Sequence, residues 1–225
     1  MCNPPDRKKG TAPKFSHTHL ECKLVLENEK DTNWEAMVEG LGVVPDNRVR
    51  ILFCVEGPTD VMALKCLSAA LHVSDPTLPN LATDPRVAFV VLGGSTLRHW
   101  VNEHYLKELG RPEVHIYDND VAKYGEYITK VNQRTDGSWG VLTKKREIEN
   151  YLSSDAIMEG LNISASIGDA DDIPELMRTI CGWKSNTAKK KLARNAFPKM
   201  TATRIAARDP DGEVRGWMRR IAAMF

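Results

Sequence analysis

Residues 50–60 read Arg-Ile-Leu-Phe-Cys-Val-Glu-Gly-Pro-Thr-Asp, and this stretch decides the fold. Five consecutive apolar residues, Ile51 to Val55, form a block of strand length without alternation, which is typical of a parallel strand buried on both faces. Glu56 then falls at the carboxyl end of that strand, the edge at which open α/β sheets bind ligands. Gly57 removes a side chain from the sharp turn that follows, and Asp60 is predicted to be the N-cap of a helix.

Two further apolar runs of strand length, Val87 to Leu92 and Val114 to Tyr117, each end in a turn sequence. Apolar residues at intervals of three and four follow all three strands and predict amphipathic helices. These helices cover about residues 60–72, 97–109 and 124–131. A fourth strand is predicted near Trp139 to Thr143. Repeated strand-loop-helix units favour the α/β class, with a parallel, doubly wound, Rossmann-like sheet flanked by helices.

The regions on either side of these units differ in charge and pattern. Residues 1–49 are predicted to be a flexible lead-in followed by a small β-α addition, with an alternating strand pattern from Leu20 to Leu26. Residues 153–225 are predicted to be a basic helical extension, because Leu176 to Phe225 hold 12 Lys or Arg residues against 3 Asp or Glu residues. The formal net charge of +1 is therefore the sum of an acidic body and a basic carboxyl-terminal region. The acidic body suits the binding of metal cations, and the basic region suits the binding of polyanions.

The cysteine content and hydropathy restrict the class of protein. The five cysteines are odd in number and contain no C-x-x-C pair, which argues against a zinc ribbon and against a full disulfide framework. No apolar run approaches the length needed to cross a bilayer, and Met1 to Gly10 lack the apolar core of a signal peptide. We therefore expect a cytoplasmic protein without a membrane partner.

Acidic side chains follow two of the predicted strands at the same edge of the sheet. Glu56 and Asp60 follow the first strand, and Asp118 and Asp120 follow the third. Four carboxylates placed together without cations would repel one another and resist ionisation, so the pattern predicts bound divalent metal. Oxygen ligands of this kind suit Mg²⁺ or Mn²⁺, and two such ions could activate a water and stabilise the leaving oxygen of a phosphodiester.

The three strand ends together resemble a known family. E-G-x-x-D after the first strand, G-G at Gly93-Gly94 after the second and D-x-D after the third look like the Toprim domain, over residues 50–152. That family includes topoisomerases, primases, RNA-maturing nucleases and the OLD (overcoming lysogenisation defect) nucleases. The resemblance implies that Glu56 is the catalytic glutamate and that Asp118 and Asp120 bind metal, while Asp60 occupies the second acidic position of the first motif.

The segment from Arg146 to Leu152, R-E-I-E-N-Y-L, resembles the OLD type most closely. By this resemblance Glu149 is the preferred additional metal ligand and Glu147 is the second candidate, although pairing with a nearby lysine is the favoured expectation for Glu147. OLD-type nucleases also use a basic residue beyond the Toprim core to stabilise transition-state charge. The candidates for that catalytic role are Lys184 and the run from Lys189 to Lys191. The residues expected to contact nucleic acid are Lys189, Lys190, Lys191 and Arg194.

The function implied by the resemblance is a metal-dependent endonuclease that cleaves DNA, OLD-like, in anti-phage defence. OLD proteins typically carry an ATPase, yet this chain contains no G-x-x-x-x-G-K-[ST]. The expected ATPase is therefore either a separate partner subunit or a domain from which this nuclease part is detached. Two alternatives stay open at this point: a Toprim-fold regulatory or binding subunit that is latent without its ATPase, and an RNA-processing Toprim ribonuclease. Homo-oligomerisation is also left open.

Overall fold

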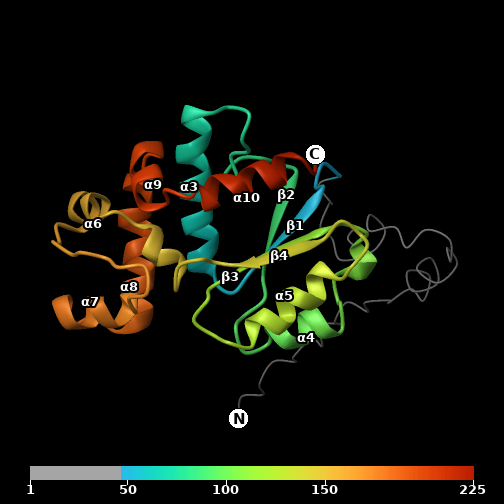
Figure 1. Cartoon of the computed structure of the whole chain (residues 1–225), viewed down its shortest axis with the longest axis horizontal. Coiled ribbons are helices and arrows are strands. Elements are labelled where there is room, and N and C mark those ends of the chain that lie inside the picture. Colours follow the sequence, from blue (N-terminus) through green and yellow to red (C-terminus); the bar gives the residue numbers. More distant parts are fainter. Residues whose placement is uncertain (1–46) are drawn as a thin grey trace, which may run out of the picture. The chain divides into compact units, whose positions relative to one another are not determined.

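The computed structural model describes residues 47–225, and Figure 1 shows the path of the chain. These residues belong to one structural unit, Asp46–Phe225. The predicted lead-in and β-α addition, including the strand pattern from Leu20 to Leu26, lie outside the described residues. Within residues 47–225, no helix is both long enough and apolar enough to cross a membrane.

Four parallel strands form the sheet, in the order β2-β1-β3-β4. Their bounds are β1 Ile51–Val55, β2 Val87–Val91, β3 Glu113–Tyr117 and β4 Trp139–Leu142. The prediction of an α/β protein with a parallel, helix-flanked sheet is confirmed, and all four strands lie where the apolar runs placed them. The chain moves from β1 to β2 on one side and then to β3 on the other side, so the loops after β1 and β3 diverge at the sheet's carboxyl edge. Such a switch point is where α/β sheets bind ligands.

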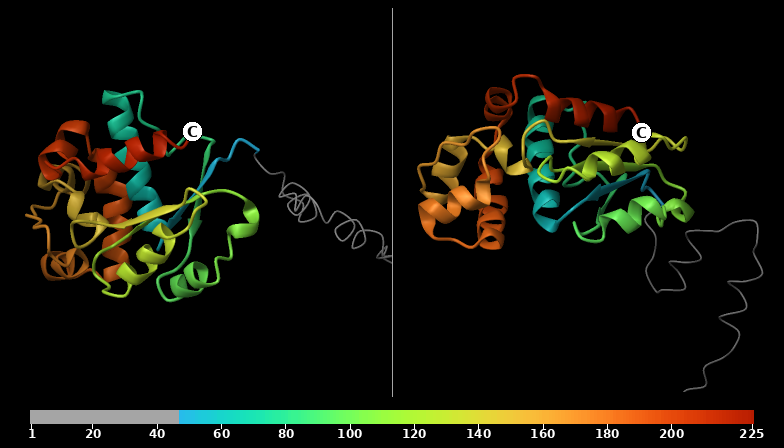
Figure 2. Two further views of the ribbon diagram at one scale, coloured as in Figure 1. Left: turned by 45° about the vertical axis from the view of Figure 1, so that its right-hand side comes forward. Right: turned by 60° about the horizontal axis from the view of Figure 1, so that its bottom comes forward.

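Helices cover both faces of the sheet, which explains why the strand sequences do not alternate. Ile51, Phe53 and Val55 of β1 pack into one hydrophobic cluster with α3 (Pro58–Ser74) and the carboxyl-terminal helices. Leu52 and Cys54 face the other cluster, beneath α4 (Leu97–Asn102) and α5 (Tyr124–Asn132). The two views in Figure 2 show these helical layers on opposite sides of the sheet. A strand with both faces covered can be apolar at every position.

Two local predictions are wrong. The helix expected over 97–109 ends at Asn102 and is followed by a turn and a short 3₁₀ helix, η1 (Lys107–Leu109). His104 lies in this turn with φ at +49°, a left-handed backbone conformation that no α-helix continues through. Asp60 is not the N-cap of α3, because the helix begins at Pro58 after Gly57. Asp60 instead lies in the first turn, where its Oδ2 accepts a hydrogen bond of 2.8 Å from the Gly57 N–H.

The carboxyl-terminal region is helical, as predicted, and shares the core of the sheet. Its elements are η2 (Ile148–Tyr151), α6 (Ser154–Leu161), α7 (Ile173–Cys181), α8 (Ser185–Lys191), the π-helical turn η3 (Leu192–Ala196), η4 (Phe197–Lys199), α9 (Ala202–Arg208) and α10 (Glu213–Ala222). Trp217 of α10 packs edge-on against Tyr151 at a centroid distance of 5.7 Å. Trp139 of β4 donates from Nε1 to the Met224 sulfur at 3.1 Å. One hydrophobic cluster therefore runs from β1 to the last helix.

Candidate metal centre

Five carboxylates gather at the switch point of the sheet. Glu56 follows β1, and Asp118 and Asp120 follow β3; each of these three offers a carboxylate oxygen within 4.8 Å of the others. Asp118 belongs at the same time to a second group, with Glu147 and Glu149 of the segment after β4, whose oxygens meet the same limit. We call these groups the outer trio (Glu56, Asp118, Asp120) and the inner trio (Asp118, Glu147, Glu149). Asp118 joins the two.

Glu56 is held in place by two donors. The Tyr124 hydroxyl donates to Oε2 at 2.7 Å, and the Asp118 backbone N–H donates to Oε1 at 3.3 Å. Burial raises the pKa of Glu56 to about 7, while the hydrogen bond from Tyr124 opposes that rise. Gly94 leaves the room that this arrangement needs, since a Cβ there would lie 3.2 Å from Glu56 Oε2 and 3.0 Å from the Tyr124 hydroxyl. A pKa near 7 in the metal-free site suits a carboxylate that exchanges a proton near neutral pH.

The two aspartates after β3 differ in environment. Asp118 is buried, with 8% of its surface exposed, and its Oδ1 accepts a hydrogen bond of 2.8 Å from the Ile148 N–H. Burial, together with the charge of Glu149, raises the pKa of Asp118 well above its usual value. Asp120 is exposed at the mouth of the site. Asp60 lies nearby, and burial raises its pKa, but among the described residues it belongs to neither trio. Its role as a metal ligand stays a prediction.

The short 3₁₀ helix η2 positions Glu149 and the Glu147 that precedes it. The Asn150 side chain accepts from the Glu147 N–H at 2.8 Å and donates to the carbonyl oxygens of Gly168 and Asp171 at 2.7 and 3.1 Å. Both glutamates are almost fully buried, at 3% and 1% exposure. Burial raises the pKa of Glu149 to about 7. The R-E-I-E-N-Y-L segment thus provides two buried carboxylates to the inner trio, Glu149, which the sequence ranked first as a ligand, and Glu147, which it ranked second.

Lys189 of α8 reaches into this group of carboxylates. Its Nζ lies 3.1 Å from Glu147 Oε2, 3.6 Å from Glu149 Oε2 and 3.6 Å from Asp118 Oδ2. Burial alone would lower the pKa of Lys189, but these carboxylates outweigh it and raise the pKa above its usual value. The expectation that Glu147 pairs with a lysine is confirmed. The inner trio thus faces an ammonium that comes from an element far along the chain.

The other basic candidates lie outside this group of charges. Lys184 is exposed at the N-cap of α8, and Lys190 and Arg194 are exposed farther along the same helical run. Lys191 is also exposed, and its Nζ lies 4.1 Å from the centroid of the Trp183 ring. Among the lysines proposed to support catalysis, the geometry therefore favours Lys189. Contacts of the exposed residues with nucleic acid stay a prediction.

Two site features could not be assigned from the sequence. Tyr124 was placed only as an apolar position of a helix, and the direction of its hydroxyl toward Glu56 depends on how α5 packs. Lys189 could not be separated from Lys190 and Lys191, because three adjacent lysines share one sequence signal. The π-helical turn that follows α8 could not be read from the sequence pattern either.

Comparison with known proteins identifies no relative. No family model, no curated protein and no solved structure matches the chain. The likeness to Toprim and OLD-type nucleases therefore rests on the sequence motifs quoted above. Function has to be argued from the carboxylates, the lysine and their geometry.

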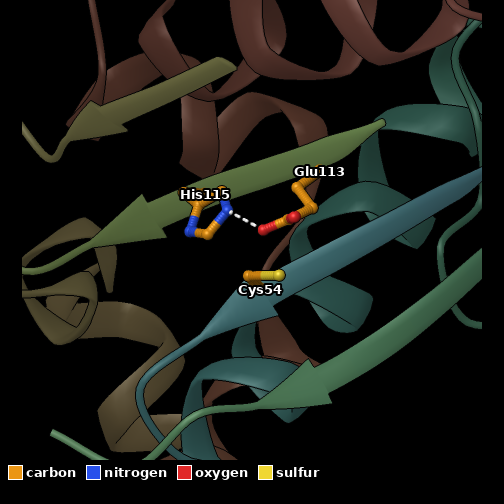
Figure 3. Close-up of side chains that lie close together, drawn as sticks. All are labelled: Cys54, Glu113 and His115. Atoms are coloured by element: carbon orange, nitrogen blue, oxygen red, sulfur yellow. Dashed lines mark hydrogen bonds and ion pairs between the residues drawn. The ribbon is translucent and has the colours of Figure 1, made fainter. Parts of the chain in front are cut away.

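A second group of titratable side chains lies on one face of the sheet, across the paired strands β1 and β3 (Figure 3). Glu113 Oε2 lies 2.7 Å from His115 Nε2 and 2.9 Å from an Arg134 guanidinium nitrogen. The other ring nitrogen of His115 hydrogen-bonds the Tyr117 hydroxyl. Cys54 is fully buried, and burial raises the pKa of its thiol well above the usual value, so it stays protonated. Since protein partners already occupy these groups, the cluster is a buried polar network between the two strands.

Proposed function

We propose that this protein is a metal-dependent nuclease that hydrolyses phosphodiester bonds of DNA at the sheet's carboxyl edge. The observation that carries the proposal is the pair of carboxylate trios sharing Asp118 at the switch point. Structural ion pairs rarely need five carboxylates in one place, because their mutual repulsion costs stability. Bound divalent cations would remove that cost. The resemblance of the motifs to Toprim nucleases supports the same reading.

The donor atoms suit a hard cation. All the candidate ligands are carboxylate oxygens, which Mg²⁺ and Mn²⁺ prefer. Within the described residues, the buried Oε2 atoms of Glu147 and Glu149 receive no hydrogen bond. Buried carboxylate oxygens without hydrogen-bond donors are costly unless a positive charge lies close by, and at the inner trio the Lys189 ammonium provides one. Glu56, Asp118 and Asp120 would hold a cation at the outer trio.

Two residues of the chain would take part in the chemistry directly. A bound Mg²⁺ or Mn²⁺ would polarise the phosphate and lower the pKa of a bound water. Burial raises the pKa of Glu56 to about 7 in the metal-free protein, and with a cation bound its ionised carboxylate would accept the proton of that water. Lys189 is positioned close to Asp118 and would offset negative charge that develops on the phosphate.

The exposed basic side chains that follow on α8 and η3 support a nucleic-acid substrate. Lys190, Lys191 and Arg194 are exposed on the helical run that carries Lys189. They would contact backbone phosphates, which are recognised without reference to base sequence. The free thiols of Cys54, Cys66 and Cys181 suit a reducing cytoplasmic setting. A separate ATPase partner and a role in anti-phage defence rest on the OLD-type resemblance alone.

Plasmid cleavage tests the proposal. We expect purified protein to nick or linearise supercoiled plasmid with Mn²⁺ or Mg²⁺ and to lose this activity with EDTA. Glu56→Gln and Asp118→Asn should each reduce the rate by at least about 100-fold, as is typical when a group central to catalysis is removed. Glu108→Gln is the matched control, because it makes the same change at an exposed glutamate in η1 and should cleave at the wild-type rate. Equal cleavage by all four proteins would contradict the assignment of the site.

A second candidate is a subunit of the same fold that stays latent until an ATPase partner binds. The lack of a G-x-x-x-x-G-K-[ST] motif favours it. This reading predicts no cleavage by the isolated chain and cleavage once the partner is added. Competition between plasmid and structured RNA distinguishes a third reading, the RNA-processing ribonuclease, since that enzyme would be inhibited by RNA far more strongly than by DNA.

A further inference from the structure

The cation that the inner trio needs is already supplied by the chain. The Lys189 ammonium lies 3.1 to 3.6 Å from one oxygen of each of Asp118, Glu147 and Glu149. The side chain of Lys189 is 25% exposed, whereas those of Glu147 and Glu149 are 3% and 2% exposed, so the ammonium lies between the buried carboxylates and solvent. Within residues 47–225, the buried Oε2 atoms of both glutamates have ion pairs with Lys189 in place of hydrogen bonds.

A divalent cation at the inner trio would compete with Lys189 for the same space. Mg²⁺ or Mn²⁺ bound by the three carboxylates would lie about 2.1 Å from the same oxygens that the Lys189 ammonium contacts. An ammonium and a divalent ion that share three ligands would repel each other strongly in a buried site. At the outer trio a divalent cation would compete less with Lys189, because Asp118 is the one carboxylate that the two trios share and Asp120 is exposed.

The local backbone fixes the direction of Lys189. Ala188, directly before it, is fully buried, while Lys190 and Lys191 are exposed. The helix passes directly from α8 into the π-helical turn at Leu192, and Leu192 and Ala193 are again buried. Such turns inside helices are rare and occur frequently at functional sites. Packing on both sides of Lys189 therefore orients its side chain toward the carboxylates.

We infer that Lys189 is a resident cation that occupies the inner trio in place of a second metal ion, so that the chain binds one divalent cation, at the outer trio. This inference rests on the proposed metal-dependent function and refines it, because the sequence led us to expect two ions. It also gives Lys189 a definite role: it neutralises the inner carboxylates, which a metal ion would otherwise have to do. Removing its charge should open a second metal site.

The test counts bound Mn²⁺ by equilibrium titration, with free Mn²⁺ measured by electron paramagnetic resonance. We expect one ion per wild-type chain and two per Lys189→Met chain. Lys189→Arg keeps the positive charge and should bind one. Lys190→Met is the matched control, because it removes the same charge from the adjacent, exposed residue, and it should also bind one.

A second measurement follows the same substitution by thermal unfolding. Without metal, Lys189→Met should be less stable than wild type, since three buried carboxylates lose their counter-ion. Mn²⁺ should raise its Tm more than it raises that of wild type. Two ions bound by wild type, or one bound by both wild type and Lys189→Met, would overturn the inference. If neither protein binds Mn²⁺, the proposed metal-dependent function is wrong as well. One ion per chain without plasmid cleavage would count against the nuclease only.

Discussion

At the residue scale, burial sets the raised pKa of Glu56 and the Tyr124 hydroxyl opposes that rise. It donates to Glu56 Oε2 at 2.7 Å and lowers the pKa that burial raises to about 7. Tyr124→Phe removes this donor, so the pKa of Glu56 should rise further. Glu56 must be ionised to accept a proton, so the acidic limb of the pH-rate profile for plasmid cleavage should move to higher pH by about one unit. The cleavage rate at pH 7 should fall several-fold as a result.

The control for this prediction is the next tyrosine of the same helix. Tyr127→Phe removes a hydroxyl from a half-buried ring of α5 that packs on Tyr124, with centroids 6.2 Å apart. It should leave the pH-rate profile in place. A profile that is identical for wild type and Tyr124→Phe would mean that Glu56 does not titrate in the rate-limiting step.

Glu149 makes the stability of the metal-free protein depend on pH. Burial raises its pKa from 4.5 to about 7 in the folded state, so the folded protein binds the proton more tightly than the unfolded chain does. Protonation of Glu149 therefore contributes to the free energy of unfolding, and this contribution is fully present below about pH 4.5. It is lost as the pH rises to 7, at up to about 1.4 kcal/mol per pH unit. With a chelator present, Tm should therefore fall between pH 5 and 7.

Glu149→Gln removes this titration and should make the fall in Tm shallower. The raised pKa values of Glu56 and Asp118 act in the same direction and should maintain part of the slope. Glu108→Gln, at an exposed position, should follow the wild-type slope. Thermal unfolding followed by circular dichroism at several pH values measures the effect, and parallel curves for all three proteins would contradict it.

The sequence predicted much of the candidate site at this scale, and the reasons for its failures are specific. Glu56, Asp118, Asp120 and Glu149 were expected together, because parallel strands end at one edge and short loops keep their first residues there. Asp60 was misplaced by a single helical turn, since Gly57 and Asp60 are both acceptable at a helix start. The position of Lys189 depends on packing between elements, which local patterns do not record.

At the element scale, the α8–η3 helix that carries Lys189 is held by close contact with α6. A Cβ on Gly160 of α6 would lie 2.1 Å from the Asn195 carbonyl oxygen, which belongs to the backbone of η3. Gly160→Ala should therefore force the two helices apart and destabilise the protein by about 2 kcal/mol or more. It should also weaken Mn²⁺-dependent cleavage of plasmid, because α8 positions Lys189.

Gly216→Ala provides the matched comparison for this prediction. Gly216 lies in α10, is exposed, and a Cβ there would have no neighbour within 4 Å. The substitution should stabilise the protein by up to about 1 kcal/mol, because alanine favours the helix more than glycine does. Urea unfolding of both variants measures the two changes, and a destabilisation of equal size in both would show that close packing at Gly160 is not the cause.

The strands were easier to predict than the helices between them. Each strand is a short apolar run bounded by turn residues, and burial on both faces makes that pattern strong. The 97–109 segment has helical spacing throughout, yet it leaves the helix after Asn102. His104 adopts its left-handed conformation with Nε2 at 3.1 Å from the buried Glu113 carboxylate. A tertiary contact therefore accompanies the interruption, and local spacing cannot reveal it.

At the scale of the whole molecule, the basic helical region completes the core of the sheet. One hydrophobic cluster contains Ile51 of β1, Phe197 of η4 and Ile221 of α10, all fully buried. A fragment of residues 47–152 would expose the face of β1 and α3 that these helices cover. We expect this fragment to lack a cooperative thermal transition by circular dichroism, in contrast to residues 47–225, which should melt in one step. A cooperative transition in the shorter fragment would contradict the prediction.

The spacing of the site along the chain has a consequence for its formation during synthesis. Glu56, Asp118, Glu149 and Lys189 come from four segments that are joined only in the folded protein. Contacts between residues so far apart in sequence form late, since long loops must close first. When the strands have emerged from the ribosome but α8 has not, the nascent chain lacks the Lys189 ammonium that neutralises the carboxylates of the inner trio. The complete candidate site therefore forms only after the carboxyl-terminal helices have emerged from the ribosome.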